Sequence, residues 1–196
     1  VVPGLCAMVL MFFGMQTSLS MVYDREMGTM RLLMTAPFPR SLLLLFHLIS
    51  TGLIGVLQVY AFLLIARLMG IEFAPLNLLF VAPVLFLSAL MFGALGFLLS
   101  LTIRQLENFA GVMNFIIFPS FFMSSALYPL WRIRESSPLL ADISFWNPFN
   151  HAVEAIRYQL YGEFNAQSFA YLLAVTCASL LSVMFFYTSH DVMKTH

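Results

Sequence analysis

The sequence predicts an all-α polytopic membrane protein with five transmembrane helices. Hydrophobic residues make up 61% of the 196 residues and charged residues only 9%, whereas a soluble domain is about half apolar and about a quarter charged. The apolar residues gather in uncharged runs at 1–23, 41–66, 73–103, 108–131 and 164–190. Each run exceeds the roughly 20 residues that a helix needs to cross a bilayer. These solid runs lack the apolar-polar alternation of membrane β-strands, which excludes a barrel.

The first expected span covers about residues 3–22 and leads into a polar hinge at residues 23–40. This hinge places five charged residues and two prolines between two uncharged runs. Such a cluster is too costly inside hydrocarbon, so the hinge must lie at the water interface. There it can either anchor the protein or contact a soluble partner.

A short amphipathic helix is expected inside the hinge. Met27, Met30 and Met34 recur at helical spacing and give this helix an apolar stripe. Pro37 and Pro39 end it, because proline cannot donate to the hydrogen-bond ladder of a helix. The hinge is therefore predicted to be a helix, a break and then the next span.

Three further spans are expected after the hinge, at about residues 41–66, 78–101 and 109–128. Gly93 and Gly96 lie in the second of these and permit a neighbouring helix to approach closely. We therefore expect this span to pack against another at its glycines.

The segment at residues 129–163 differs from the spans on either side of it. It mixes charged residues with six aromatic residues, which is the composition typical of the lipid headgroup boundary. We expect short interfacial or re-entrant helices there, on the external side. The last span then covers about residues 167–189.

The orientation of the chain depends on its basic residues, which divide five against four between the two sides. The compact hinge holds three arginines, while residues 129–163 spread three over a long segment. The positive-inside rule gives most weight to short loops and so favours a cytoplasmic hinge. Because the chain begins with Val-Val-Pro-Gly inside a span, we also expect that a preceding segment is missing.

Motifs of several other function classes are missing from the sequence. There is no Gly-x-x-x-x-Gly-Lys-Ser/Thr phosphate loop, so this chain is not expected to hydrolyse ATP. The nearest catalytic candidates are His47 near Ser50 and His151 near Glu154. His47 and Ser50 are more simply read as a hydrogen-bonded polar pair between helices, and His151, Glu154 and Arg157 as a local interfacial network. No basic cluster indicates a nucleic-acid partner. We expect neither catalytic nor metal-binding residues.

Two separate stretches resemble the permease subunits of type-2 ATP-binding-cassette exporters, the group that includes bacterial drug, polysaccharide and nodulation-factor export systems. The hinge resembles that family's signature after a span, with Asp24, Arg25, Glu26, Gly28, Thr29, Leu32, Leu33, Thr35, Pro37 and Arg40. The second stretch is FFMSSALYPL at 121–130, followed by the Asn-Pro, His-Ala and Arg motif that contains Asn147, Pro148, His151 and Arg157. The matches cover most of the chain, whose five spans resemble spans two to six of a six-span, N-terminally truncated permease.

The resemblance implies that the hinge carries a coupling helix that docks on a separate ATPase subunit. The residues expected at this contact are Asp24, Arg25, Glu26, Gly28, Thr29, Arg31, Leu32, Pro37 and Arg40. ATP and Mg would be bound by the partner subunit, and no cofactor by this chain. A homodimer or a paired permease in the bacterial cytoplasmic membrane is also implied. A plain interfacial helix with solvated charges is the alternative reading of the hinge.

The resemblance further implies that the first and fourth spans line a translocation path. At helical spacing, Phe12 and Gln16 share one face of the first span, and Asn114 and Phe118 share one face of the fourth. We expect paired faces of two protomers to form a largely aromatic cavity with hydrogen bonds from the two amides. Helix packing alone would explain the same stripes.

These observations favour a permease subunit that exports a drug-like, lipid or glycan substrate with energy from a partner ATPase. The alternative is a membrane scaffold or assembly protein without transport activity. An intramembrane enzyme ranks third, because no catalytic constellation is present. Residues 1–196 are expected to form one transmembrane domain.

Overall fold

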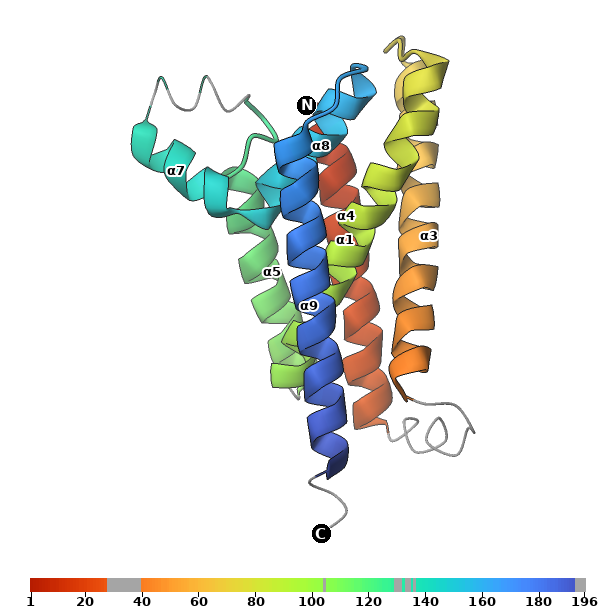
Figure 1. Cartoon of the computed structure of the whole chain (residues 1–196), viewed down its shortest axis with the longest axis vertical. Coiled ribbons are helices and arrows are strands. Elements are labelled where there is room, and N and C mark those ends of the chain that lie inside the picture. The colour runs from red at the N-terminus through yellow and green to blue at the C-terminus, as the bar shows by residue number, and fades with distance from the viewer. Residues whose placement is uncertain (28–39, 104, 129–131, 133–134, 136, 193–196) are drawn as a thin grey trace.

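The computed structural model describes the chain except for residues 28–39, 104, 129–131, 133–134, 136 and 193–196. Within the described part, the regular secondary structure is all helical: α1 (Val2–Glu26), α3 (Arg40–Leu68), α4 (Pro75–Thr102), α5 (Leu106–Phe122), α7 (Pro138–Trp146), α8 (Pro148–Leu160) and α9 (Ala166–Val192). Figure 1 shows α1, α3, α4, α5 and α9 running along the long axis, with α7 and α8 gathered at one end.

Four helices in the described part are long and apolar enough to cross a membrane, over Val2–Tyr23, Leu42–Leu68, Pro75–Thr102 and Ala166–Phe186. They correspond to the first, second, third and fifth predicted spans, and they confirm a helical multi-pass membrane protein. The fourth predicted span corresponds to α5, which has 17 residues and a length of about 25 Å. That α5 also crosses the bilayer, making five spans, stays a prediction.

The end of α5 was predicted wrongly. The hydropathy pattern extended this helix to about residue 128, whereas it ends at Phe122 and its C-cap is Met123. The backbone carbonyls of Ser120 and Met123 accept hydrogen bonds from the side chain of Asn147, at 2.7 and 3.4 Å. These carbonyls at the end of α5 are thus bound by a residue much later in the chain.

The close approach of α1 and α4 is made at glycines, as expected for Gly93 and Gly96. A Cβ atom on Gly14 of α1 would lie 2.9 Å from the backbone nitrogen of Gly93, so α1 could not keep this separation from α4 with a larger residue at position 14. A Cβ on Gly96 would lie 2.6 Å from the Oγ of Ser18. That buried hydroxyl donates to the backbone carbonyl of Gly14 at 3.1 Å. Small residues therefore set the central helix pair of the bundle.

An aromatic cluster joins α8 to the membrane helices. Phe149, at the start of α8, packs against Phe92 of α4 with ring centroids 5.9 Å apart and against Phe121 of α5 at 6.0 Å. Phe92 and Phe149 are each 1% exposed. Because aromatic rings bury large apolar areas, this cluster anchors the amphipathic α8 in the bundle. Short helices were predicted within residues 129–163, and α7 and α8 confirm them.

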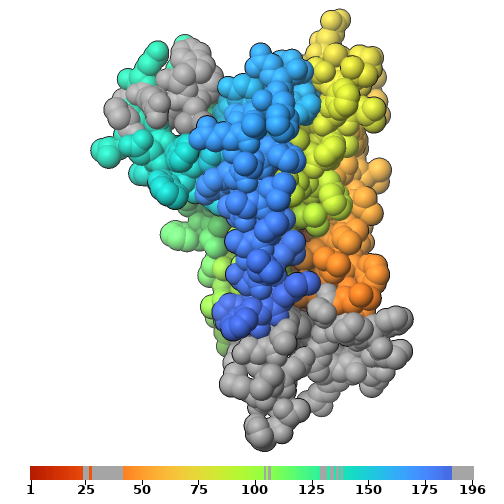
Figure 2. Space-filling view, viewed as in Figure 1, coloured from red at the N-terminus to blue at the C-terminus, as the bar shows by residue number. Residues whose placement is uncertain are grey.

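The outer faces of the bundle are apolar, as a lipid environment requires. Figure 2 shows α9 lying over one face, with α3 and α4 on one side of it and α5 and α7 on the other. Large apolar side chains on α3 such as Leu57 and Leu64 are 71% and 61% exposed. In water such surface would be unfavourable, but lipid tails solvate it.

Candidate functional site

Asn147 ties the start of α8 to the end of α5. Its side-chain oxygen accepts from the backbone N–H of Phe149 at 3.0 Å and so caps α8. Pro148 follows at the first helical position, where its missing N–H costs nothing. The amide nitrogen of Asn147 donates to Ser120, as described above. The side chain of Asn147 therefore hydrogen-bonds to a backbone N–H at the start of α8 and to a backbone carbonyl at the end of α5.

The backbone of Ser125, in the turn after α5, is hydrogen-bonded to side chains of α8 through both its N–H and its carbonyl. Its N–H donates to the side-chain oxygen of Asn150 at 2.9 Å, and its carbonyl accepts from the guanidinium of Arg157. Arg157 also forms an ion pair with Glu154 at 2.6 Å. We call Asn147, Asn150, Glu154 and Arg157 the α8 clasp. The sequence motif had identified Asn147 and Arg157 but not Asn150.

The α8 clasp is braced by the rest of the bundle. At the far end of α8, the carbonyl of Leu160 accepts from the side chain of Asn77 on α4 at 3.0 Å. On the other side of the turn, a Cβ on Gly4 of α1 would lie 2.6 Å from the backbone oxygen of Ala126. The turn after α5 is thus enclosed between α1 and α8, and α5 is fixed at this end.

His151 lies on α8 next to the clasp but bonds to different elements. Its Nε2 is 2.7 Å from the carbonyl of Phe145, which can only accept, so this nitrogen carries the proton. Its Nδ1 lies 3.4 Å from the hydroxyl of Ser168, and its ring stacks on Tyr171 at 3.9 Å. Burial lowers the pKa of His151 below 6.5, although the hydrogen bond to Phe145 and the charge of Glu154 oppose this shift.

The two histidine networks expected from the sequence have different outcomes. On α8, Glu154 pairs with Arg157 as expected, while His151 turns toward α7 and α9. On α3, the buried Nε2 of His47 has no hydrogen-bond partner in the described part of the chain. The expected hydrogen bond between His47 and Ser50 stays a prediction.

The predicted path residues are brought together only in part. Phe12 of α1 and Phe118 of α5 meet edge to face, with ring centroids 6.4 Å apart and planes at 79°. Gln16 lies on α1 in an open groove of about 340 Å³, whereas Asn114 lies exposed on α5 and does not line it. The aromatic contact between the two helices is present within one chain, while a cavity between protomers stays a prediction.

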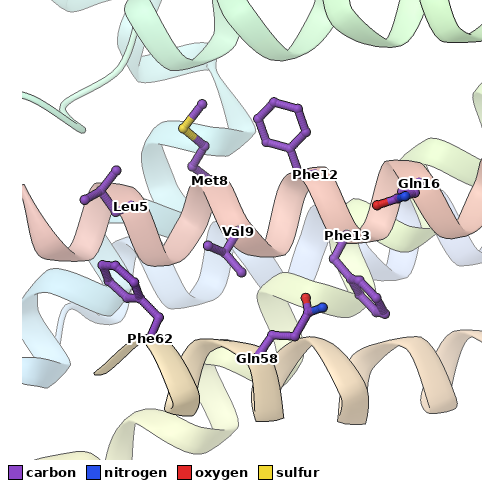
Figure 3. A pocket seen from close by; sticks show the side chains of 8 residues that line it. All are labelled: Leu5, Met8, Val9, Phe12, Phe13, Gln16, Gln58 and Phe62. Carbon is purple, nitrogen blue, oxygen red and sulfur yellow. The ribbon is translucent and has the colours of Figure 1, made fainter. Parts of the chain in front are cut away.

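Gln58 and Phe62 of α3 also line the groove and were not assigned to the path. Figure 3 shows both side chains directed from α3 toward α1, opposite Leu5 and Val9. The signal in the sequence was Gln58 itself, an amide deep inside a predicted span. Its neighbours could not be assigned because helical spacing does not tell which face of α3 meets α1.

The hinge is described only at its two borders. Asp24, Arg25 and Glu26 belong to the last turn of α1, so the first span continues into the hinge, and Arg40 is the first residue of α3. Gly28, Thr29, Arg31, Leu32 and Pro37 lie outside the described residues. Among the residues that are described, no three His, Cys, Asp or Glu side chains are grouped to hold a metal ion.

Comparisons with known proteins agree with the sequence motifs. Residues 1–161 match the family described as "ABC-2 type transporter". This range contains both the hinge and the α8 clasp. A protein of Cyanophora paradoxa that carries the provisional name transport permease ycf38 is 30% identical over 161 residues, or 80% of this chain. The match covers 53% of that protein, so the chain spans about half the length of this relative.

Proposed function

Because the chain belongs to the ABC-2 type transporter family, we propose that this transport permease works as an exporter subunit driven by a separate ATPase. The hinge at residues 23–40 is the proposed docking site, and ATP and Mg are bound by the partner. A homodimer or paired permease in a bacterial cytoplasmic membrane completes the proposal. The export direction, the drug-like, lipid or glycan substrate and this location come from the resemblance noted in the sequence.

The continuity of α1 supports this proposal most directly. One unbroken helix runs from Val2 to Glu26, so the charged triplet Asp24, Arg25 and Glu26 and the residue Phe12 belong to the same rigid element. They are about 18 Å apart along the helix axis. A force applied to the triplet by a partner would therefore reach the contact between Phe12 and Phe118.

The α8 clasp would hold α5 in place while that force moves α1. It fixes α5 at the end opposite the hinge, through the hydrogen bonds to Ser120 and Ser125. A shift of α1 would then change the angle between α1 and α5 instead of moving both together. This geometry suits alternating access, in which one element moves against another.

Co-purification with the cognate ATPase tests the proposal. We expect the permease to capture the ATPase and to stimulate its hydrolysis of ATP, and the triple charge reversal D24K/R25E/E26K to weaken capture at least tenfold. The matched control is R67E/E72K, which reverses one charge in the last turn of α3 and one in the turn that follows it, at the other end of the bundle. Undiminished capture by the triple variant would refute docking at the triplet, and a membrane scaffold would neither stimulate hydrolysis nor move a substrate.

A further inference from the structure

The open groove on α1 has the size of a small-molecule site. Its volume is about 340 Å³, within the roughly 300–1,000 Å³ typical of ligand pockets. Its lining comes from α1 and α3: Leu5, Met8, Val9, Phe12, Phe13, Gln16, Gln58 and Phe62 (Figure 3). The wall at Phe12 continues to α5 through the ring contact with Phe118. The groove therefore adjoins the helix pair that we assign to the transport movement.

Two glutamine side chains are the polar groups of this groove. Gln16 and Gln58 are both exposed, and neither amide has a hydrogen-bond partner in the described part of the chain. Gln16 lies seven residues before the end of the span Val2–Tyr23, and Gln58 ten residues before the end of Leu42–Leu68. Both amides therefore lie at least about 10 Å inside their spans.

An amide at this depth needs a partner. Hydrocarbon offers no hydrogen bonds, so an amide that faces lipid is costly. Polar side chains inside spans accordingly face protein, water or a ligand. Here Gln16 and Gln58 line the same groove from two different helices, which is the arrangement of a binding site with a few polar groups in an apolar lining.

The chemistry of the lining defines the ligand. None of the eight lining residues is ionisable, so a charged group would be buried without a counter-ion. The three phenylalanines and Met8 suit an acyl chain or a flat apolar body. Amides can both donate to and accept from an uncharged ester, hydroxyl or amide group. Beside Gln58, Leu57 is 71% exposed on the lipid-facing surface of α3, so a ligand could enter from the bilayer.

We propose that this groove binds an uncharged amphipathic lipid of the diacylglycerol kind, taken up laterally from the membrane. This inference rests on the proposed function, since the bound lipid is then the class of molecule that is transported. Gln16 and Gln58 bind the polar group of the lipid, and Phe12, Phe13 and Phe62 pack against its chains. Gln58 and Phe62 thereby become specificity residues on a helix that the sequence did not assign to the path.

Photolabelling of the purified chain in lipid nanodiscs tests this site. The probes are a benzophenone-bearing diacylglycerol, a fatty acid with the same benzophenone and its quaternary ammonium analogue. We expect the diacylglycerol to label Met8 at least fivefold more than either charged probe, with competition by unlabelled diacylglycerol. The variant Q16L/Q58L should lose at least 80% of this labelling, whereas Leu57→Ala, on the lipid-facing side of α3, should retain it.

Several results would overturn the proposal. Equal labelling by the three probes, labelling that Q16L/Q58L leaves unchanged, or no competition would each contradict it. Occupation of the groove by a second copy of the chain would also contradict it. That outcome would appear as a crosslink between two Phe62→Cys chains together with loss of the probe label at Met8. The assay needs neither ATPase nor transport, so it separates the two proposals. ATP-driven transport without diacylglycerol binding refutes this inference alone, and binding without any ATP-driven transport refutes the exporter function alone.

Discussion

The buried side chain of Asn150 accepts a hydrogen bond from the backbone N–H of Ser125 at 2.9 Å, which links α8 to the turn after α5. Both residues are 0% exposed. This bond also sets the orientation of the amide group, because a flipped amide would place its nitrogen against the N–H of Ser125. Asn150 is therefore a structural residue of the α8 clasp.

Replacement of Asn150 by leucine should destabilise the protein by about 1–3 kcal/mol, the usual cost of a buried N–H that loses its partner. The measurement is the apparent melting temperature in detergent. Asn108→Leu is the matched control, because Asn108 lies exposed on α5 and its side chain donates to the nearby Gln105. Equal melting temperatures for the two variants would show that the α8 clasp does not hold α5.

The ion pair between Glu154 and Arg157 should behave as a coupled unit. The two side chains are 9% and 18% exposed, so Arg157→Met leaves a largely buried carboxylate without its cation and should cost about 3–5 kcal/mol. In the double variant E154Q/R157M the remaining charge is removed, so part of this loss should be recovered. A double-mutant cycle on thermal stability measures the coupling, and strictly additive effects would contradict it.

The crossing of α1 and α4 predicts opposite outcomes for two glycine substitutions. Gly14→Ala places a Cβ 2.9 Å from the backbone of Gly93 and should lower the melting temperature. Gly111→Ala on α5 meets nothing within 4 Å and should be neutral or stabilising by up to about 1 kcal/mol, since alanine favours helix. If both substitutions had the same effect, the close approach of α1 and α4 would not be the cause of the lower melting temperature of Gly14→Ala.

The lowered pKa of His151 predicts a stability that depends on pH. Below 6.5 the unfolded chain takes up a proton that the buried imidazole resists. Between the folded-state pKa and 6.5 the unfolded state thus binds more protons, and stability rises with pH. We expect the melting temperature to fall between pH 7 and pH 5, and to fall less in His151→Gln. An unchanged pH profile in this variant would assign the effect to other groups.

Much of the fold could be predicted because long apolar runs have few alternatives to membrane helices. Four predicted spans match helices within a few residues at each end, and α1 continues into the hinge. The end of α5 could not be predicted in this way. Residues 123–128 carry no charge, so the uncharged run continues past Phe122, and the groups that bind the end of α5, such as Asn147, come more than 20 residues later.

The site was predicted where motifs carried information and missed where packing decided it. Phe12 and Phe118 lie on faces that helical spacing identified, and they do meet. Asn150 was missed because the sequence does not distinguish a buried asparagine from an exposed one, and its role depends on the position of Ser125 in the fold. Gln58 was visible as an intramembrane amide, but its place beside α1 depends on the rotation of α3.

Crosslinking between the hinge and the ATPase tests the central claim most directly. In a chain whose Cys6 and Cys177 are replaced by alanine, Arg25→Cys would be treated with a short bismaleimide in the presence of the cognate ATPase. We expect a crosslinked complex from Arg25→Cys and none from Glu72→Cys, which lies in the turn between α3 and α4 at the other end of the bundle. Absence of the complex from Arg25→Cys, or equal yield from Glu72→Cys, would contradict coupling through the hinge.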